Sequence, residues 1–195
     1  MELVLELDRN LLIFLNSLGS EKFDNLWLIL TNKFTHIPLY LLLLFLLFRS
    51  LRYSYQKQKL YKVYSIYMLS IVFLIFISDQ LSNLFKNSIQ RLRPCHDDQI
   101  QNIIRVVKED CGGLYSFFSA HASNSFVIAT IFILFMNRKK EYFLLFLWAA
   151  VVAYSRVYLG VHYPSDIIIG SLIGISISYF FYIAIFNRLV GKLFK

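Results

Sequence analysis

Four long apolar runs constrain the fold of this chain of 195 residues more than any other feature. They cover residues 66–77, 127–136, 142–153 and 167–186. A helix needs about 20 residues to cross the hydrocarbon of a bilayer, and each run can belong to a helix of that length. A transmembrane β-barrel would need alternating segments of about 10 residues, and these runs do not alternate. The sequence therefore predicts an all-α, polytopic membrane bundle.

We expect five membrane helices, at about 33–49, 62–85, 117–137, 141–159 and 165–186. The first has Pro38 in its first turns, where the missing N–H costs little. Composition agrees with a lipid environment, because 57% of the residues are hydrophobic and only 16% are charged. In soluble domains roughly 45–50% of the residues are hydrophobic and about 25% are charged. The length allows one domain over 1–195 and hardly two.

The N-terminal segment 1–32 is amphipathic rather than uniformly apolar. Its leucines recur on one helical face, and its first charged side chains lie elsewhere, which is typical of a helix in the membrane interface. Its acidic start is unlike a signal peptide, and no small-residue cleavage site follows a basic region. A second short apolar piece covers 23–30. If that piece crosses the membrane, the number of spans becomes six.

Basic residues set the expected orientation. Eleven of the twenty lysines and arginines lie on one side, in short loops and the tail: Arg49, Arg52, Lys57, Lys59, Lys62, Arg138, Lys139, Lys140, Arg188, Lys192 and Lys195. The positive-inside rule makes that side cytoplasmic. The opposite side then faces outward, and it carries the long loop 87–116.

Both cysteines, Cys95 and Cys111, lie in this outer loop. In an oxidising compartment a disulfide between them would close the loop and contribute about 3 kcal/mol. The alternative is two free thiols. Their spacing is not the C-x-x-C of a metal or redox site.

Polar side chains gather at the outer ends of four predicted helices. They are Lys86, Arg91 and Arg93 at and after the end of the second span, Ser119 and His121 at the start of the third, Ser155, Arg156 and His162 at the end of the fourth, and Asp166 at the start of the fifth. Charged groups at membrane depth generally line a site or a water-filled cavity. We therefore predict one polar site at the outer face.

The residue types at this face fit phosphate chemistry. Lys86, Arg93 and Arg156 offer three cations, and the two guanidinium groups match phosphate oxygens. The helix that begins near Ser119 adds N–H groups and the positive end of its dipole. These groups can stabilise developing negative charge, so we expect neither a metal nor another cofactor.

Two histidines supply the remaining chemistry. Asp166 lies four residues after His162 and can accept a hydrogen bond from its Nδ1, which presents Nε2 as the nucleophile. His121 is then left as the general acid for the leaving oxygen. Either histidine alone would more often be structural, and the predicted site depends on their combination with the cations and Asp166.

Three segments resemble, in order, the signature motifs of the phosphatidic acid phosphatase type 2 superfamily: KNSIQRLRP at 86–94, FSAH at 118–121 and SRVYLGVHYPSD at 155–166. That family consists largely of integral membrane lipid phosphatases, with soluble acid phosphatases and vanadium haloperoxidases as relatives. The resemblance implies a phosphohistidine mechanism, with nucleophile His162, its partner Asp166, acid His121, and phosphate ligands Lys86, Arg93, Ser119 and Arg156.

The middle motif of the family usually reads Pro-Ser-Gly-His, whereas this chain has Phe118 and Ala120 in the first and third places. Ala120 keeps a backbone N–H for a phosphate oxygen, provided that the site does not need the positive φ that favours glycine. We therefore retain Ala120 among the phosphate-binding residues.

Three further residues have alternative interpretations. Asp79 is an acid inside the second span, and we expect a supporting role with Lys86 or a site arginine as its partner. Ser155 either supports the site or packs as a small helix residue. Arg91 is interpreted as a surface or headgroup contact. Considered by itself, Lys86 would be expected to extend its ammonium group to the membrane interface.

These observations predict metal-independent hydrolysis of a lipid-linked phosphate monoester or pyrophosphate at the outer leaflet. Resemblance to small bacterial members implies undecaprenyl diphosphate, phosphatidylglycerol phosphate or lipid A phosphates as substrates, and an inner-membrane protein whose site faces the periplasm. The alternative is a transporter or non-catalytic phospholipid-binding protein with the same cationic pocket. The 32 tyrosines and phenylalanines fit membrane belts, so we expect no nucleic-acid partner. The sequence gives no oligomeric state.

Overall fold

The computed structural model describes the backbone of residues 2–108, 110–137 and 139–194. Arg138, Lys195 and the side chain of Lys192, three of the basic residues used for the orientation, lie outside this description. The helices are α1 (Glu2–Ser17), α2 (Glu21–Thr31), α3 (Ile37–Ser54), α4 (Lys57–Ile89), α5 (Ala120–Phe135), α6 (Leu144–Tyr158), α7 (Pro164–Phe181) and α8 (Asn187–Phe194). Short 3₁₀ turns cover Lys33–His36, Pro94–His96 and Lys140–Phe143, and a π turn covers Tyr182–Phe186.

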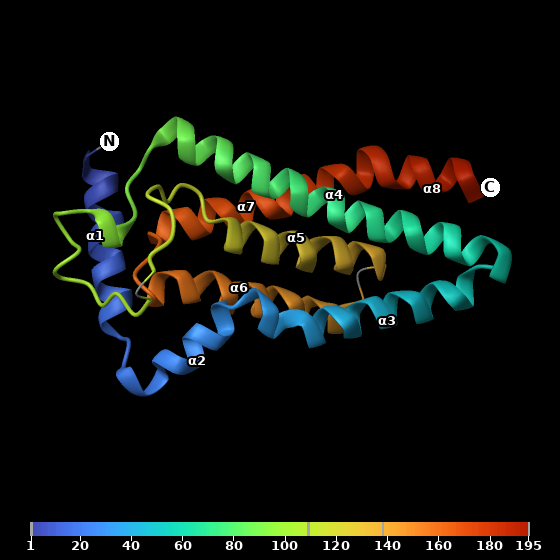
Figure 1. Ribbon diagram of the computed structural model, residues 1–195. Helices are drawn as coiled ribbons and strands as arrows, with labels where there is room; N and C mark the ends of the chain where they lie inside the picture. Colours follow the sequence, from blue (N-terminus) through green and yellow to red (C-terminus); the bar gives the residue numbers. More distant parts are fainter. Residues whose placement is uncertain (1, 109, 138, 195) are drawn as a thin grey trace.

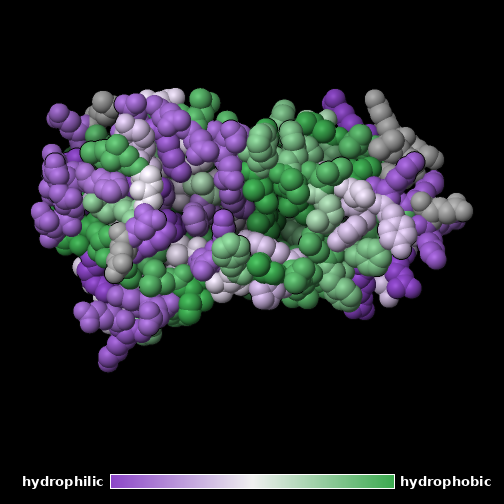
Figure 2. Space-filling view, in the orientation of Figure 1, coloured by the Kyte–Doolittle hydropathy of each residue, from purple (hydrophilic) through white to green (hydrophobic). Residues whose placement is uncertain are grey.

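Helices α3 to α7 run along the long axis of the molecule, whereas α1 lies across one end (Figure 1). On the face in Figure 2, an apolar band separates two polar ends. Among the described residues, three helical stretches are long and apolar enough to cross a membrane: Lys33–Ser54, Lys59–Ile89 and Pro164–Gly191. The predicted all-α membrane bundle is confirmed.

Helices α5 and α6 are shorter than the spans predicted for them, with 16 and 15 residues. The third span begins late because Ser119 has an extended backbone and caps the helix that follows it. The fourth begins late because Lys140–Phe143 forms a 3₁₀ turn. Helix α2 has 11 residues, or about 16 Å, which is too short to cross about 30 Å of hydrocarbon by itself.

Helix α5 lies at the centre of the bundle and packs against α4, α6 and α7. Most of its residues are buried, which explains why it is apolar on every side. Gly174 of α7 allows the closest approach, because a Cβ there would clash with the backbone oxygen of Ser123. At Gly170 a Cβ would lie 2.7 Å from the backbone oxygen of Ser119. The two glycines thus bring the beginnings of α5 and α7 together at the outer end of the bundle.

Candidate active site

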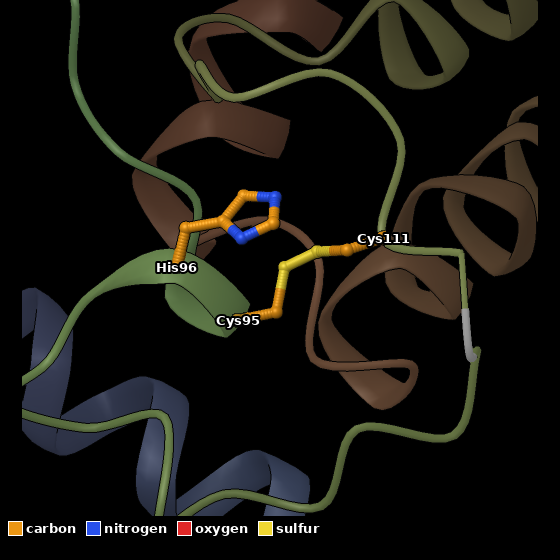
Figure 3. Close-up of side chains that lie close together, drawn as sticks. All are labelled: Cys95, His96 and Cys111. Atoms are coloured by element: carbon orange, nitrogen blue, oxygen red, sulfur yellow. A yellow bond between two sulfur atoms is a disulfide. The ribbon is translucent and has the colours of Figure 1, made fainter.

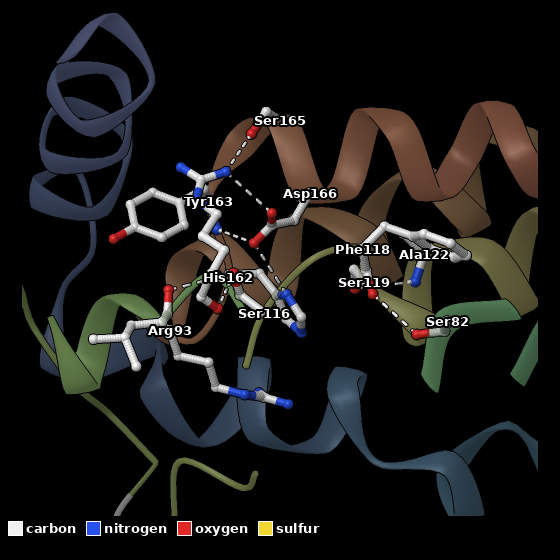
Figure 4. A network of polar contacts seen from close by, with 12 residues as sticks. Ser82, Arg93, Ser116, Phe118, Ser119, Ala122, His162, Tyr163, Ser165 and Asp166 are labelled. Atoms are coloured by element: carbon white, nitrogen blue, oxygen red, sulfur yellow. Dashed lines mark hydrogen bonds and ion pairs between the residues drawn. The ribbon is translucent and has the colours of Figure 1, made fainter. Parts of the chain in front are cut away.

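His162 and Asp166 form the centre of the polar cluster. His162 lies between α6 and α7, and Asp166 lies in the first turn of α7. The His162 Nδ1 is 3.3 Å from Oδ2 of Asp166, and the same oxygen accepts a hydrogen bond from the backbone N–H of Tyr163 at 3.0 Å (Figure 4). Both side chains are buried. Asp166 thus orients the imidazole, and Nε2 is the ring nitrogen that remains for a substrate.

Burial lowers the pKa of His162 from 6.5 to about 4. The hydrogen bond to Asp166 opposes this shift, and the positive charges of Arg156 and Arg93 add to it. Since a group with a depressed pKa is neutral above that value, the imidazole of the free protein is unprotonated near pH 7. That is the form that attacks an electrophile.

We therefore expect the His162 ring to titrate near pH 4 in the ligand-free protein. The measurement is a ¹⁵N NMR titration of histidine-labelled protein in detergent, with the His162 resonance assigned from its absence in His162→Ala. A midpoint close to 6.5 would contradict the buried position of the ring.

Arg93 and Arg156 bring two guanidinium groups into the same buried region. Arg93 is 8% exposed and Arg156 is 4% exposed. Each makes one side-chain hydrogen bond with an Nη1 atom, Arg93 to the carbonyl oxygen of Cys111 at 3.0 Å and Arg156 to Oγ1 of Thr31 at 2.6 Å. The Nε atom of each is buried without a partner in the described part of the chain. Unpaired buried donors are costly, and an anion between them would satisfy both.

Lys86 and His121 complete the cluster. The charges of Arg93, Arg156 and Asp166 act on the Lys86 ammonium, which places it beside them at the end of α4. His121 lies in the first turn of α5 and lines a cavity of about 310 Å³. Arg156, His162 and Lys86 act electrostatically on its ring. The four predicted chain segments therefore meet at one place.

The start of α5 is held by Ser119. Its hydroxyl accepts a hydrogen bond from the N–H of Ala122 at 3.4 Å, and its own N–H donates to the backbone oxygen of Asp166 at 3.1 Å. Ala120 is the first residue of the helix and does not have a positive φ. Alanine in place of the usual glycine therefore brings no backbone strain, and its N–H belongs to the free first turn.

The structure gives partners to two residues assigned a supporting role. Asp79 accepts a hydrogen bond from Nδ2 of Asn124 at 2.8 Å, and its charge also acts on the ammonium of Lys86, a cation expected as its partner. The hydroxyl of Ser155 is buried and donates to the carbonyl of Val152 in its own helix at 2.7 Å. Ser155 therefore packs as a small helix residue.

The sequence interpretation missed Arg91 as a site residue. Its Nη2 atom lies 2.6 Å from Oδ2 of Asp8, and its Nη1 atom donates to Oγ of Ser165 at 2.8 Å and to Oδ1 of Asp166 at 3.2 Å. Its guanidinium stacks over the Tyr163 ring, 3.6 Å from the centroid. Arg91 therefore links α1 to the carboxylate that orients His162, instead of forming a surface contact.

Helix α1 buries the face opposite its leucine stripe. Asp8, Leu12 and Asn16 are buried at intervals of four residues, whereas Leu3, Leu7 and other apolar residues of the stripe are exposed. The apolar stripe is thus left exposed, while the face with Asp8, Leu12 and Asn16 packs on the protein. Asp8, Leu12 and Asn16 are spaced i, i+4, i+8. This spacing was the sequence signal that could have revealed which face of α1 packs on the protein.

Cys95 and Cys111 lie in the outer loop with Cα atoms 6.5 Å apart, and their sulfur atoms are joined in the structure (Figure 3). His96 lies beside them. The bridge occupies both sulfurs, so this trio does not form a metal site. Because Cys111 also supplies the carbonyl that receives the Arg93 hydrogen bond, the closed loop supports Arg93.

Sequence comparison identifies close relatives. The family model of the PAP2 superfamily matches residues 64–189. The chain is 31% identical to a lipid A 4'-phosphatase from Bacteroides thetaiotaomicron over 195 residues, which cover 99% of this chain and 83% of the relative. It is 32% identical to a lipid A 4'-phosphatase from Porphyromonas gingivalis over 187 residues, which cover 93% and 74% of the two chains.

Two solved structures share the fold. A phosphatidylglycerolphosphate phosphatase from Bacillus subtilis superposes with a TM-score of 0.70 at 18% identity, covering 100% of this chain and 90% of the other. LpxE from Aquifex aeolicus gives a TM-score of 0.58 at 24% identity, covering 87% of this chain and 91% of the other. Because the family model covers more than half of the chain and the two relatives are similar over most of their length, this chain belongs to the PAP2 superfamily and is a membrane-embedded lipid phosphatase.

Proposed function

We propose that this chain hydrolyses a lipid-linked phosphate at the outer leaflet, without a metal, through a phosphohistidine on His162. One observation carries the proposal: the unpaired Nε atoms of the buried Arg93 and Arg156 lie in the same cluster as an imidazole that Asp166 orients. A tetrahedral dianion satisfies both guanidinium groups and brings its phosphorus to the imidazole. Lys86, Ser119 and the N–H of Ala120 complete the phosphate contacts.

In the first step, Nε2 of His162 attacks phosphorus and the bond from phosphorus to the leaving oxygen breaks. His121 gives its proton to that oxygen, while Asp166 stabilises the positive charge on the imidazole of His162. In the second step, water transfers a proton to His121 and attacks phosphorus. The P–N bond then breaks, inorganic phosphate leaves, and His121 is protonated again.

The position of the site explains why the enzyme is embedded in a membrane. The cluster lies at the end of the bundle where α1 runs crosswise, so a lipid can present its phosphate while its chains stay in hydrocarbon (Figure 1). The Lys- and Arg-rich connections lie at the other end, and the positive-inside rule assigns them to the cytoplasm. The Cys95–Cys111 bridge fits an oxidising space, and we assign the site to the periplasmic side of a bacterial inner membrane.

The relatives from Bacteroides thetaiotaomicron and Porphyromonas gingivalis are lipid A 4'-phosphatases, and we propose the same class of substrate here: a phosphate monoester on a glycolipid. Undecaprenyl diphosphate and phosphatidylglycerol phosphate are the competing candidates. We also propose that residues 1–195 form a single catalytic domain, in which α1 and the outer loop 87–116 both contact the site.

The test is a phosphate-release assay of purified protein in detergent and a metal chelator, with all three lipid phosphates as substrates. We expect release in the presence of chelator, with the highest kcat/KM on the glycolipid phosphate. Release that stops on chelation and returns with a divalent cation would contradict the metal-independent mechanism. Phosphate-dependent binding without any release would indicate the non-catalytic alternative.

A further inference from the structure

The cavity beside His121 extends beyond the phosphate cluster into the bundle. Its volume is about 310 Å³, which is within the range of small-ligand pockets. Apolar side chains from α4, α5 and α6 line it, together with a small set of polar and aromatic residues: Thr31, Lys33, His36, Tyr40, Asp79, Asn124 and Trp148. The phosphate mechanism uses none of these directly, so the cavity is available to the part of the substrate next to the phosphate.

Asp79 and Asn124 form the most polar part of this cavity. The Asn124 amide must donate Nδ2–H to the carboxylate of Asp79, which fixes the amide so that its oxygen points away. That oxygen, Oδ1, is buried and has no partner among the described residues. The carboxylate itself can accept more hydrogen bonds than the single one that Asn124 supplies. The pair therefore offers acceptors in excess of donors, at a depth where unmet polar groups are costly.

The polar neighbours at the other wall do not remove this excess. His36 is already engaged on both ring nitrogens, with the carbonyl of Leu30 at 2.9 Å and with Nε1 of Trp148 at 3.3 Å. Lys33 is exposed, and its ammonium lies 5.2 Å from the centre of the Phe34 ring. The charge of Lys86 acts on Asp79, but no hydrogen bond between the two side chains is present among the described residues. A ligand with several hydroxyl or amide N–H groups would balance the acceptors.

We propose that this cavity is a headgroup site that selects a phosphate monoester carried on a saccharide. This inference rests on the proposed function and narrows its substrate class. Sugar hydroxyls and amide N–H groups would donate to Asp79 and Asn124, while Tyr40 and Trp148, which meet edge to face with centroids 6.1 Å apart, would contact the apolar side of the ring. A diphosphate headgroup carries no such donors, and its second phosphate would meet the negative charge of Asp79.

The experiment compares kcat/KM for an acylated glucosamine disaccharide phosphate with kcat/KM for a polyisoprenyl diphosphate and for a glycerophospholipid phosphate. The test variant is Asp79→Leu with Asn124→Leu, which removes both members of the pair together; any effect through Lys86 acts on the phosphate of all three substrates alike. The saccharide preference should fall at least about tenfold, because one or two hydrogen bonds to a charged group are lost. Asp79→Asn, which keeps a hydrogen-bonding side chain at this position, should lower the preference less.

Ser78→Ala with Ser123→Ala is the matched control. These serines hydrogen-bond each other across the same two helices at 2.6 Å, are buried, and do not line the cavity. This control should keep the substrate preference of the parent. An unchanged preference in the Asp79/Asn124 variants, or a parent that prefers the diphosphate or the glycerophospholipid, would overturn the headgroup site alone. A parent that releases phosphate from none of the three would instead overturn the proposed function.

Discussion

Replacing His162 with alanine should lower phosphate release by at least about 10⁴-fold, because removal of a nucleophile stops covalent catalysis. The residue is buried and held by Asp166, and no other histidine has an acid at this spacing. Substrate binding should persist, since Arg93 and Arg156 remain. The measurement is phosphate release in detergent, together with trapping of a phosphoryl group on the protein. The trapped label should be acid-labile and stable to alkali, and the variant should lack it.

His96→Ala is the control for this variant. His96 also lies on the outer side of the bundle, but it neighbours the cysteine pair and contributes nothing to the proposed chemistry. This variant should retain activity and form the labelled intermediate. If His162→Ala turned over substrate as fast as the parent, the phosphohistidine mechanism would be wrong.

Replacing Arg91 with alanine should destabilise the protein by about 3 kcal/mol and lower its activity. The side chain of Arg91 is 16% exposed and pairs with Asp8 and Asp166, whose side chains are 9% and 0% exposed. Removing the cation leaves two carboxylates close together and largely buried, which is the costly way to break an ion pair. Thermal unfolding in detergent should show a Tm lower by roughly 10 °C.

Arg9→Ala provides the matched comparison. Arg9 is the neighbour of Asp8 and also forms an ion pair, with Asp97 at 3.5 Å, but its side chain is 35% exposed. This longer, partly exposed pair should contribute at most about 1 kcal/mol, so the Tm should fall less than in Arg91→Ala. If Arg91→Ala and Arg9→Ala lowered the Tm equally, the contacts of Arg91 with Asp8 and Asp166 would not stabilise the protein more than an ordinary ion pair does.

The sequence was sufficient to predict the helices and most of the site, because both depend on local patterns. Apolar runs located α3 to α7, and motif spacing placed His162 four residues before Asp166 at the start of a helix. The ends of α5 and α6 were less accurate, since a cap at Ser119 and a 3₁₀ turn interrupt otherwise apolar stretches. Hydropathy does not report such interruptions.

The contacts of Arg91 and Asp79 could not be predicted in the same way. Arg91 meets Asp8 across 83 positions of the chain, and Asn124 meets Asp79 across 45. No periodicity links such residues. In addition, Asn124 is uncharged, so charge pairing does not identify it as a partner of Asp79. Long-range pairs of this kind follow from how the helices pack against one another.

The crosswise position of α1 also has a practical consequence for handling the protein. Asp8 contacts Ser165 and Arg91 next to the catalytic carboxylate, so changes near the chain start act on the reaction centre itself. The opposite end of the molecule carries α8, far from these contacts (Figure 1). Affinity tags and fluorescent reporters therefore belong after α8, where attaching them does not disturb turnover.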